Sequence, residues 1–333
     1  MAERPSPGYD RGMPLAEHAA VIETASPFVG QRADRLVQSL CGLSRSQVTG
    51  LFDRACVRIN GTVAAQPAQR LAAGDRLELK YDPSQRYHPR NRPRRNLGFE
   101  IIFEDPHLLV VDKPAGLLSV PTARAEKNTL VGKAADYVRH VSQGRGAFSV
   151  HRLDRGVSGV LVLGKTQEIV RQLKDQFAAS KPEREYVAIV AGKVAQRQGT
   201  FETLLATDKD LNRFSTEDEE IGQLAITHYR VVAHLDGATL VQVRLETGRR
   251  NQIRVHFAEA GHPVLGDERY WPDLSAHPHW RHQRLALHAR LLGFEHPVSQ
   301  EPLRFEAPLP AEIDAFLRHH KPATTRRGEP KQT

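Results

Sequence analysis

Between residues 27 and 82, the spacing of apolar residues changes along the chain from a helical to a strand period. Ala33, Leu36 and Val37 recur at the three- and four-residue intervals that place side chains on one face of a helix. The predicted elements are a helix over residues 32–40, a second helix capped by Ser44, a hairpin turning at Asn60-Gly61, and a strand over residues 76–81. This segment is therefore predicted to be a small α/β domain.

From residue 99 to residue 317 the pattern is a longer series of strands and helices. Hairpin-like pairs of strands are interspersed with helices, whereas a parallel sheet would require regular strand–helix alternation. The sequence contains neither a Gly-rich dinucleotide fingerprint nor a phosphate-binding loop. The predicted fold class is α+β, with a mixed, mainly antiparallel central sheet and flanking helices beside the small N-terminal domain.

Three segments have no sustained apolar period. Residues 1–26 are polar and contain prolines, so we expect a flexible tail. Residues 83–98 contain five arginines and three prolines, which predicts an extended linker between the two domains. Residues 318–333 are expected to form a basic tail.

The charge of the chain suggests an anionic partner. Its 333 residues include 47 Lys and Arg against 39 Asp and Glu, a formal net charge of +8. Because 40% of the residues are hydrophobic, which is enough for a substantial core, this excess favours nucleic acid over a membrane surface. No apolar run is long enough to span a bilayer, and two cysteines make neither a disulfide framework nor a complete zinc site. We expect a cytoplasmic protein.

The most informative stretch for chemistry is His151–Gly159. Asp154 lies between Arg152 and Arg155, and neighbouring cations favour the ionised form of a carboxylate. An ionised carboxylate on a loop can be a nucleophile or an electrostatic stabiliser. A structural Asp–Arg pair in a strand-connecting loop would explain the same residues equally well. Taken alone, this stretch leaves both interpretations open.

The stretch His151-Arg152-Leu153-Asp154 resembles the HRLD signature of the RluA-type pseudouridine synthases, which isomerise uridine in RNA. Further motifs similar to that family stand in its order, and they include Asp112-Lys113-Pro114, the strand with Tyr186, Gln252-Ile253-Arg254 and Gly261–Asp267. Residues 27–82 resemble an S4-type RNA-binding domain. The resemblance covers most of the chain, and it implies a synthase catalytic domain over residues 99–317.

The resemblance also implies roles for individual residues. Asp154 would be the essential acid, which either attacks C1′ of the ribose or helps to eliminate a ribosyl proton. Tyr186 would stack on the uracil after it leaves the RNA stack, and Arg254 would pair with Asp154. The implied substrate-binding residues are Arg152, His151, Leu153, Arg155 and Ile253. The implied RNA-binding residues are Arg32, Arg35, Arg45, Arg54, Arg92, Arg94 and Arg95.

At two places the chain departs from the family pattern. Gly156-Val157 stands where the family usually has Asp-Thr, and Arg250-Asn251 stands where it usually has Thr-His. Neither change affects the acid, the tyrosine or the arginine, so both bear on which RNA is used. Ribosomal RNA is the expected substrate and transfer RNA the second candidate. Two other classes stay open: a non-catalytic RNA-binding assembly factor and a base-removing RNA glycosylase.

No cofactor is expected, because the implied reaction is redox-neutral and moves no phosphoryl group. The His-rich segment 277–282, with His288 beyond it, suggests a metal site. However, it has no nearby set of acidic or Cys ligands, and a solvated basic loop is therefore the favoured interpretation. We expect no metal, no membrane partner and a monomeric protein.

Overall fold

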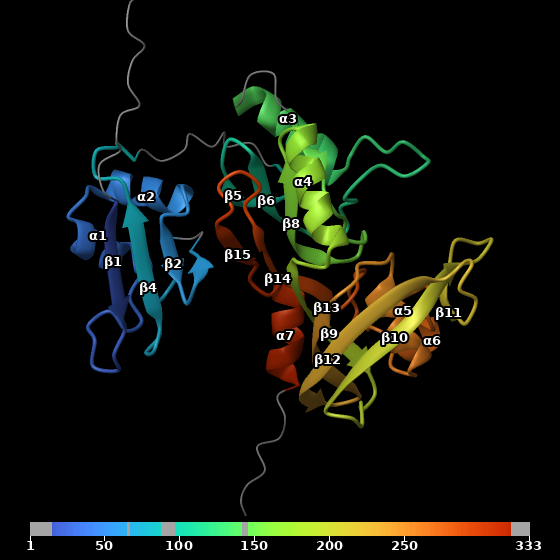
Figure 1. The fold of residues 1–333 in the computed structure, drawn as a ribbon. Helices are drawn as coiled ribbons and strands as arrows, with labels where there is room; N and C mark the ends of the chain where they lie inside the picture. The colour runs from blue at the N-terminus through green and yellow to red at the C-terminus, as the bar shows by residue number, and fades with distance from the viewer. Residues whose placement is uncertain (1–14, 65–66, 88–96, 142–145, 321–333) are drawn as a thin grey trace, which may run out of the picture. The chain divides into compact units, whose positions relative to one another are not determined.

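The structure, a computed structural model, describes residues 15–64, 67–87, 97–141 and 146–320 (Figure 1). The chain divides into two compact units, one ending at Arg94 and the other beginning at Arg95. This division falls inside the segment that the sequence predicts to be a linker.

The first unit is a four-stranded antiparallel sheet with two helices. Its elements are β1 (Ala16–Val21), α1 (Ala33–Cys41), α2 (Arg45–Asp53), β2 (Val57–Ile59), β3 (Thr62–Val63) and β4 (Arg76–Tyr81). The strand order is β1-β4-β2-β3. Ser44 caps α2 by accepting the Gln47 backbone N–H at 3.3 Å, and the Gln47 side chain completes a capping box. Asn60 and Gly61 both have positive φ, as the predicted tight hairpin turn requires.

The prediction of a flexible tail over residues 1–26 is wrong for its second half. Residues 16–21 form β1, which pairs antiparallel with β4 along its full length, and Ile22 is buried in the core of the first unit. The segment Ala16–Val21 consists largely of alanines and polar residues, which carry little local preference for a strand. The strand therefore owes its formation to pairing with β4, which the local pattern does not reveal.

Two other predicted boundaries also move. Tyr87, which lies within the predicted linker, is buried in the core of the first unit, and its hydroxyl accepts the backbone N–H of Asp82 at 2.9 Å. At the other end, α7 (Ala311–His319) continues past residue 317, so Arg318 and His319 belong to a helix and not to a tail.

The second unit is built on one eleven-stranded sheet. Its strands are β5 (Glu100–Glu104), β6 (Leu108–Lys113), β7 (Phe148–Ser149), β8 (Ser158–Gly164), β9 (Glu183–Ala191), β10 (Gln198–Thr207), β11 (Arg213–Thr216), β12 (Gln223–Leu235), β13 (Ala238–Leu245), β14 (Leu287–Glu295) and β15 (Pro302–Glu306). The main order is β11-β10-β12-β13-β9-β14-β8-β6-β5, with β15 beside β14 and β7 beside β8. Among these pairs only β8 and β14 run parallel, so the predicted mixed, mainly antiparallel α+β fold is confirmed.

The helices of the second unit lie along different parts of this sheet (Figure 1). They are α3 (Leu130–Val141), α4 (Gln167–Ala178), α5 (Gln252–Glu259), α6 (Pro272–Ser275) and α7. The helices α3 and α4 contact β7, and α4 also contacts β8, whereas α5 contacts β11 and β12. Every residue of β8 is buried, as expected for a continuous apolar run in the middle of a sheet.

The parallel contact between β8 and β14 positions the candidate site. Gly159 lies opposite Ala289, and Ala289 also lies opposite Tyr186 of β9. The three residues therefore form one row across the neighbouring strands β8, β14 and β9. Gly159 has a φ of +120°, and a Cβ there would lie 2.1 Å from the Ala289 carbonyl oxygen. Only glycine therefore allows β8 to approach β14 this closely. The loop that contains Asp154 directly precedes β8 and is thereby placed near Tyr186.

Candidate active site

The loop that carries Asp154 is held by hydrogen bonds to the segment after β6. The Ser119 hydroxyl donates to the carbonyl of Leu153 at 2.6 Å and accepts the Leu153 backbone N–H at 3.0 Å. The backbone N–H of Gly116 donates to the Arg155 carbonyl at 2.7 Å, and Arg155 Nε donates back to Gly116 at 3.1 Å. Asp154 therefore lies between two anchored neighbours, which limits its movement.

Arg254 joins Asp154 to a second carboxylate. Its Nη1 donates to Asp154 Oδ2 at 3.1 Å, while its Nε and Nη2 donate to Asp267 at 2.7 and 2.8 Å. Burial alone would lower the pKa of Arg254, but the hydrogen bonds and charge of Asp267, followed by those of Asp154, raise this pKa above its ordinary value. The guanidinium also lies 5.0 Å from the centroid of the Tyr270 ring. Arg254 therefore stays protonated and connects the carboxylates of Asp154 and Asp267.

Asp267 is a residue of the site to which the sequence pattern alone gives no role. Its side chain is fully buried, and besides Arg254 it accepts the backbone N–H groups of Arg269 and Tyr270 at 3.0 and 3.1 Å. A buried carboxylate with four donors is rigid, so it fixes the direction in which Arg254 points. The Asp that ends Gly261–Asp267 was the available signal, but the sequence did not indicate that its partner was Arg254.

Lys113 is a second residue whose environment the sequence did not predict. It is completely buried, and its ammonium group donates to the carbonyls of Leu117 and Pro114 at 2.8 and 3.0 Å. Burial lowers the pKa of Lys113 to about 7, even though the nearby charge of Asp154 favours the protonated form. This lysine therefore stabilises the turn after β6 and places its charge near Asp154.

Tyr186 and Asp154 share one cavity of about 120 Å³, which we call the Asp154 cavity. The predicted residues that line it are Asp154, Tyr186, Arg254, Arg152, Leu153 and Ile253. Burial raises the pKa of Tyr186, the charge of Arg184 lowers it, and the charge of Asp154 raises it further, so the hydroxyl keeps its proton at neutral pH. The Asp154 carboxylate, the Arg254 guanidinium and the Tyr186 ring therefore line one cavity that a planar base could enter.

Comparisons with known proteins agree with this geometry. Residues 107–259 match the profile of the family described as "RNA pseudouridylate synthase". The chain is 35% identical over 307 residues to the "Ribosomal large subunit pseudouridine synthase D" of Zymomonas mobilis, covering 89% of this chain and 96% of that protein. This chain belongs to the RNA pseudouridine synthase family. A synthase of the same name from Pseudomonas aeruginosa is 32% identical over 294 residues, covering 85% of this chain and 90% of that protein.

The fold of this synthase is also found among solved structures. The human protein "RNA Pseudouridylate Synthase Domain Containing 4" aligns with a TM-score of 0.55 at 23% identity, covering 66% of this chain and 92% of that one. This likeness confirms the predicted fold class, and the relatives in sequence confirm the predicted family and enzyme class.

Two of the predicted substrate-binding residues of this synthase do not line the Asp154 cavity. The ring of His151 stacks on Phe177 with 4.7 Å between centroids, and its Nε2 accepts the backbone N–H of Val162 at 3.2 Å. Burial lowers the pKa of His151 to about 3, so the ring is neutral. Arg155 Nε donates to the Gly116 carbonyl. Both side chains therefore stabilise the Asp154 loop by contacts outside the cavity.

The two departures from the family pattern have different surroundings. Asn251 borders the cavity, accepts Arg254 Nη1 at 3.2 Å and donates to the Tyr270 hydroxyl at 2.9 Å. It thus adds a third acceptor for Arg254. Gly156 packs against Leu285, whose Cγ would lie 3.0 Å from a Cβ at this position, so a longer side chain here would require Leu285 to shift.

Three of the predicted RNA-binding arginines lie together in the first unit. Arg32, Arg35 and Arg45 line one surface hollow of about 250 Å³, although Arg32 is also paired with Asp34 at 2.7 Å. Arg54 does not line this hollow, and its guanidinium lies 5.6 Å from the centroid of the Tyr87 ring. The remaining predicted residues, Arg92, Arg94 and Arg95, lie outside the described residues.

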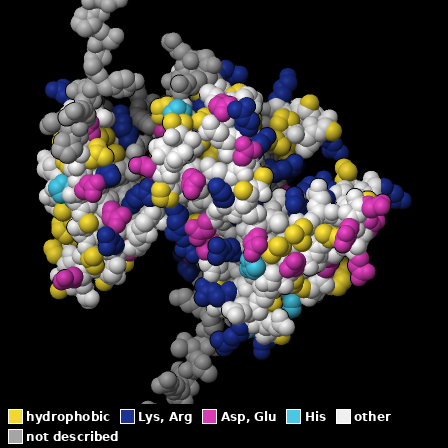
Figure 2. Space-filling view, viewed as in Figure 1, with side chains coloured by type: hydrophobic (Ala, Val, Ile, Leu, Met, Phe, Trp, Pro, Cys, Tyr) yellow, Lys and Arg dark blue, Asp and Glu magenta, His cyan; other side chains and the backbone are white. Residues whose placement is uncertain are grey.

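Basic side chains line a hollow in the surface of the second unit (Figure 2). Figure 2 shows Lys and Arg side chains gathered along the hollow between the α3–α4 side and the β10–β11 side of this unit. Such a surface suits a phosphate backbone. Within the described part of the chain, no helix is long and apolar enough to cross a membrane.

Proposed function

We propose that this synthase isomerises uridines in the RNA of the large ribosomal subunit. Relatives from Zymomonas mobilis, Nitrosomonas europaea and Pseudomonas aeruginosa bear the name ribosomal large subunit pseudouridine synthase D, and each aligns with at least 85% of this chain. The net charge of +8 supports a polyanionic substrate of this kind.

The observation that carries the proposed chemistry is the ion pair between Asp154 and Arg254 in the Asp154 cavity, at 3.1 Å. The uridine base must leave the RNA stack before any side chain reaches its sugar. Asp154 then acts at the ribose, either on C1′ or by assisting proton elimination, while Arg254 holds its carboxylate in place. Arg152, which is exposed at the cavity, contacts the RNA around the extruded nucleotide.

Tyr186 serves the second half of the reaction. The bond from N1 to C1′ breaks, the uracil rotates, C5 bonds to C1′, and the C5 proton must leave while N1 gains a proton. The Tyr186 ring stacks on the base, and its phenolate, formed when the hydroxyl loses its proton to solvent, accepts the C5 proton. Because burial raises the pKa of Tyr186, the phenolate is scarce at neutral pH, and the transfer is expected to become faster as the pH rises.

The test uses large-subunit RNA from a strain that lacks the gene. The wild-type chain should convert specific uridines, mapped by chemical marking of pseudouridine, and Asp154→Asn should lower the rate by about 10³-fold or more while RNA binding stays intact. Asp136→Asn, at an exposed position of α3, is the matched control and should be fully active.

Each other result contradicts a defined part of the proposal. Turnover by Asp154→Asn within about tenfold of wild type would exclude Asp154 as the essential acid. Release of free uracil would identify a base-removing glycosylase. Modification of transfer RNA, with large-subunit RNA left unchanged, would refute the proposed substrate.

A further inference from the structure

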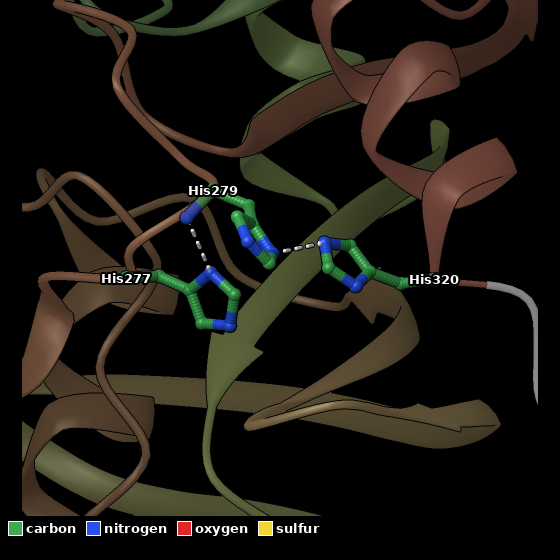
Figure 3. Close-up of side chains that lie close together, drawn as sticks. All are labelled: His277, His279 and His320. Carbon is green, nitrogen blue, oxygen red and sulfur yellow. Dashed lines mark hydrogen bonds between the residues drawn. The ribbon is translucent and has the colours of Figure 1, made fainter.

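Three histidines from distant parts of the chain converge in the second unit. His277 and His279 lie on the segment after α6, and His320 directly follows α7. One ring nitrogen of each lies within 4.8 Å of the other two, and Figure 3 shows the three rings grouped together. Their centroids are 4.9 to 5.7 Å apart. None of the three lines the Asp154 cavity. The cluster is therefore separate from the proposed chemistry.

We propose that His277, His279 and His320 form a binding site for a divalent transition-metal ion such as Zn²⁺. Neutral imidazole nitrogens are preferred ligands of Zn²⁺, Ni²⁺ and Cu²⁺. With zinc–nitrogen bonds near 2.0–2.1 Å, two ligands of a tetrahedral site lie about 3.3 Å apart. His279 Nδ1 and His320 Nε2 are hydrogen-bonded at 3.1 Å, which is close to that separation, and an ion would replace the proton between them.

The contacts of His277 suit the third ligand. Its Nε2 lies 3.0 Å from the carbonyl oxygen of Asp236, to which it donates, so the lone pair is on Nδ1. Metal-bound histidines commonly make such a hydrogen bond through the other ring nitrogen. At present Nδ1 accepts the backbone N–H of His279 at 3.2 Å, a long hydrogen bond that an ion would replace.

Packing holds the rings in these positions. The Phe316 ring of α7 lies 5.1 Å from the His277 ring and 4.2 Å from the His320 ring, between centroids. Gly237 leaves room for His277, because a Cβ at position 237 would lie 3.1 Å from His277 Nε2. The site therefore packs against a buried part of the fold, and the exposed side chain of His279 makes it accessible to ions from solvent.

An ion here would tie the end of α7 to the segment before β14. Because the three ligands come together only in the folded chain, the ion would bind the folded form and raise the Tm of the protein. The three protein ligands leave a fourth tetrahedral position for water. The sequence disfavours a metal because the His-rich segment 277–282 has no further ligands nearby, but the fold supplies His320 from 41 residues beyond His279.

The experiment uses the full chain without a polyhistidine tag, stripped with a chelator and returned to metal-free buffer. Zn²⁺ binding is measured by calorimetry, and the visible absorption of Co²⁺ reports four-coordinate nitrogen ligation. Wild type should bind one ion per chain and should gain Tm with Zn²⁺. His279→Ala, at an exposed position, should weaken binding by about tenfold or more.

The matched control is His282→Ala, which removes an exposed histidine of the same segment and should bind as wild type does. His320→Ala tests the distant ligand and should also lose the Zn²⁺-dependent gain in Tm. Wild-type protein that binds no ion, or His279→Ala that binds Zn²⁺ as tightly as wild type, would overturn the proposal. An equal loss of Zn²⁺ affinity in His282→Ala and His279→Ala would also overturn it, because it would mean that Zn²⁺ binds surface histidines without a defined site.

Discussion

Replacing Asp267 by Asn should separate the positioning of Arg254 from the stability of the fold. In the structure Oδ1 of Asp267 accepts Arg254 Nη2 and the backbone N–H groups of Arg269 and Tyr270, while Oδ2 accepts only Arg254 Nε. The amide oxygen of Asn can replace Oδ1. Its NH₂ group then takes the place of Oδ2 and faces another donor, Arg254 Nε.

The cost of Asp267→Asn follows from these contacts. One charge-assisted hydrogen bond of 2.7 Å is lost, and water cannot replace it because the Asp267 side chain is fully buried. Leaving such a donor unsatisfied costs about 2–3 kcal/mol. For the second unit, Arg95–Thr333, that corresponds to a Tm lower by about 4–6 °C. Arg254 relieves the donor–donor contact by turning, which moves its Nη1 away from Asp154.

The assay is single-turnover formation of pseudouridine, measured well below the Tm of the variant so that the protein stays folded. A displacement of about 1 Å in a positioned group costs up to about 10²-fold in rate, so we expect a loss of about 10- to 100-fold. RNA affinity should change little, because Asp267 has no exposed surface. Asp273→Asn, at an exposed position of α6, is the control and should show neither effect.

Two outcomes would refute this reasoning. A variant with a lowered Tm but the wild-type rate would show that Asp267 supports the fold and does not position Arg254. A variant that loses RNA affinity at an unchanged single-turnover rate would show that the Arg254–Asp267 pair acts in binding and not in the chemical step.

Three further changes test other parts of the structure. Tyr186→Phe should retain RNA binding and lose about 10²-fold in rate; a wild-type rate would leave its hydroxyl without a role. Burial lowers the pKa of His256 and of His288 to about 4. Below pH 6.5 these two histidines bind protons in the unfolded chain and not in the folded chain, and together they lower the free energy of unfolding by about 4 kcal/mol between pH 7 and pH 5; His288→Asn should weaken this pH dependence in urea unfolding, and an unchanged dependence would contradict the assignment. Gly159→Ala should destabilise the protein by about 3 kcal/mol or more, because its Cβ meets a carbonyl of β14; Gly261→Ala, with open space around it, should cost much less in the same measurement.

Where its signals were local, the sequence determined the individual elements. The Ser44 capping box, the Asn60-Gly61 turn and the alternating residues of β4 each act within a few positions, and all three appear in the structure as predicted. The strand β1 was missed because its stability comes from pairing with β4, some 60 positions away in the chain. Local preference carries no information about such a partner.

The order of the motifs in the sequence was enough to predict the family, which the relatives confirm, and to select Asp154, Tyr186 and Arg254 as the proposed catalytic residues. Only the tertiary structure decided how these residues meet. Arg254 lies 100 residues from Asp154, and its direction depends on Asp267, while the row of Gly159 and Ala289 brings Tyr186 to the same cavity. Distances between such side chains depend on strand register and close packing across the sheet, which are properties of the whole fold and not of any local pattern.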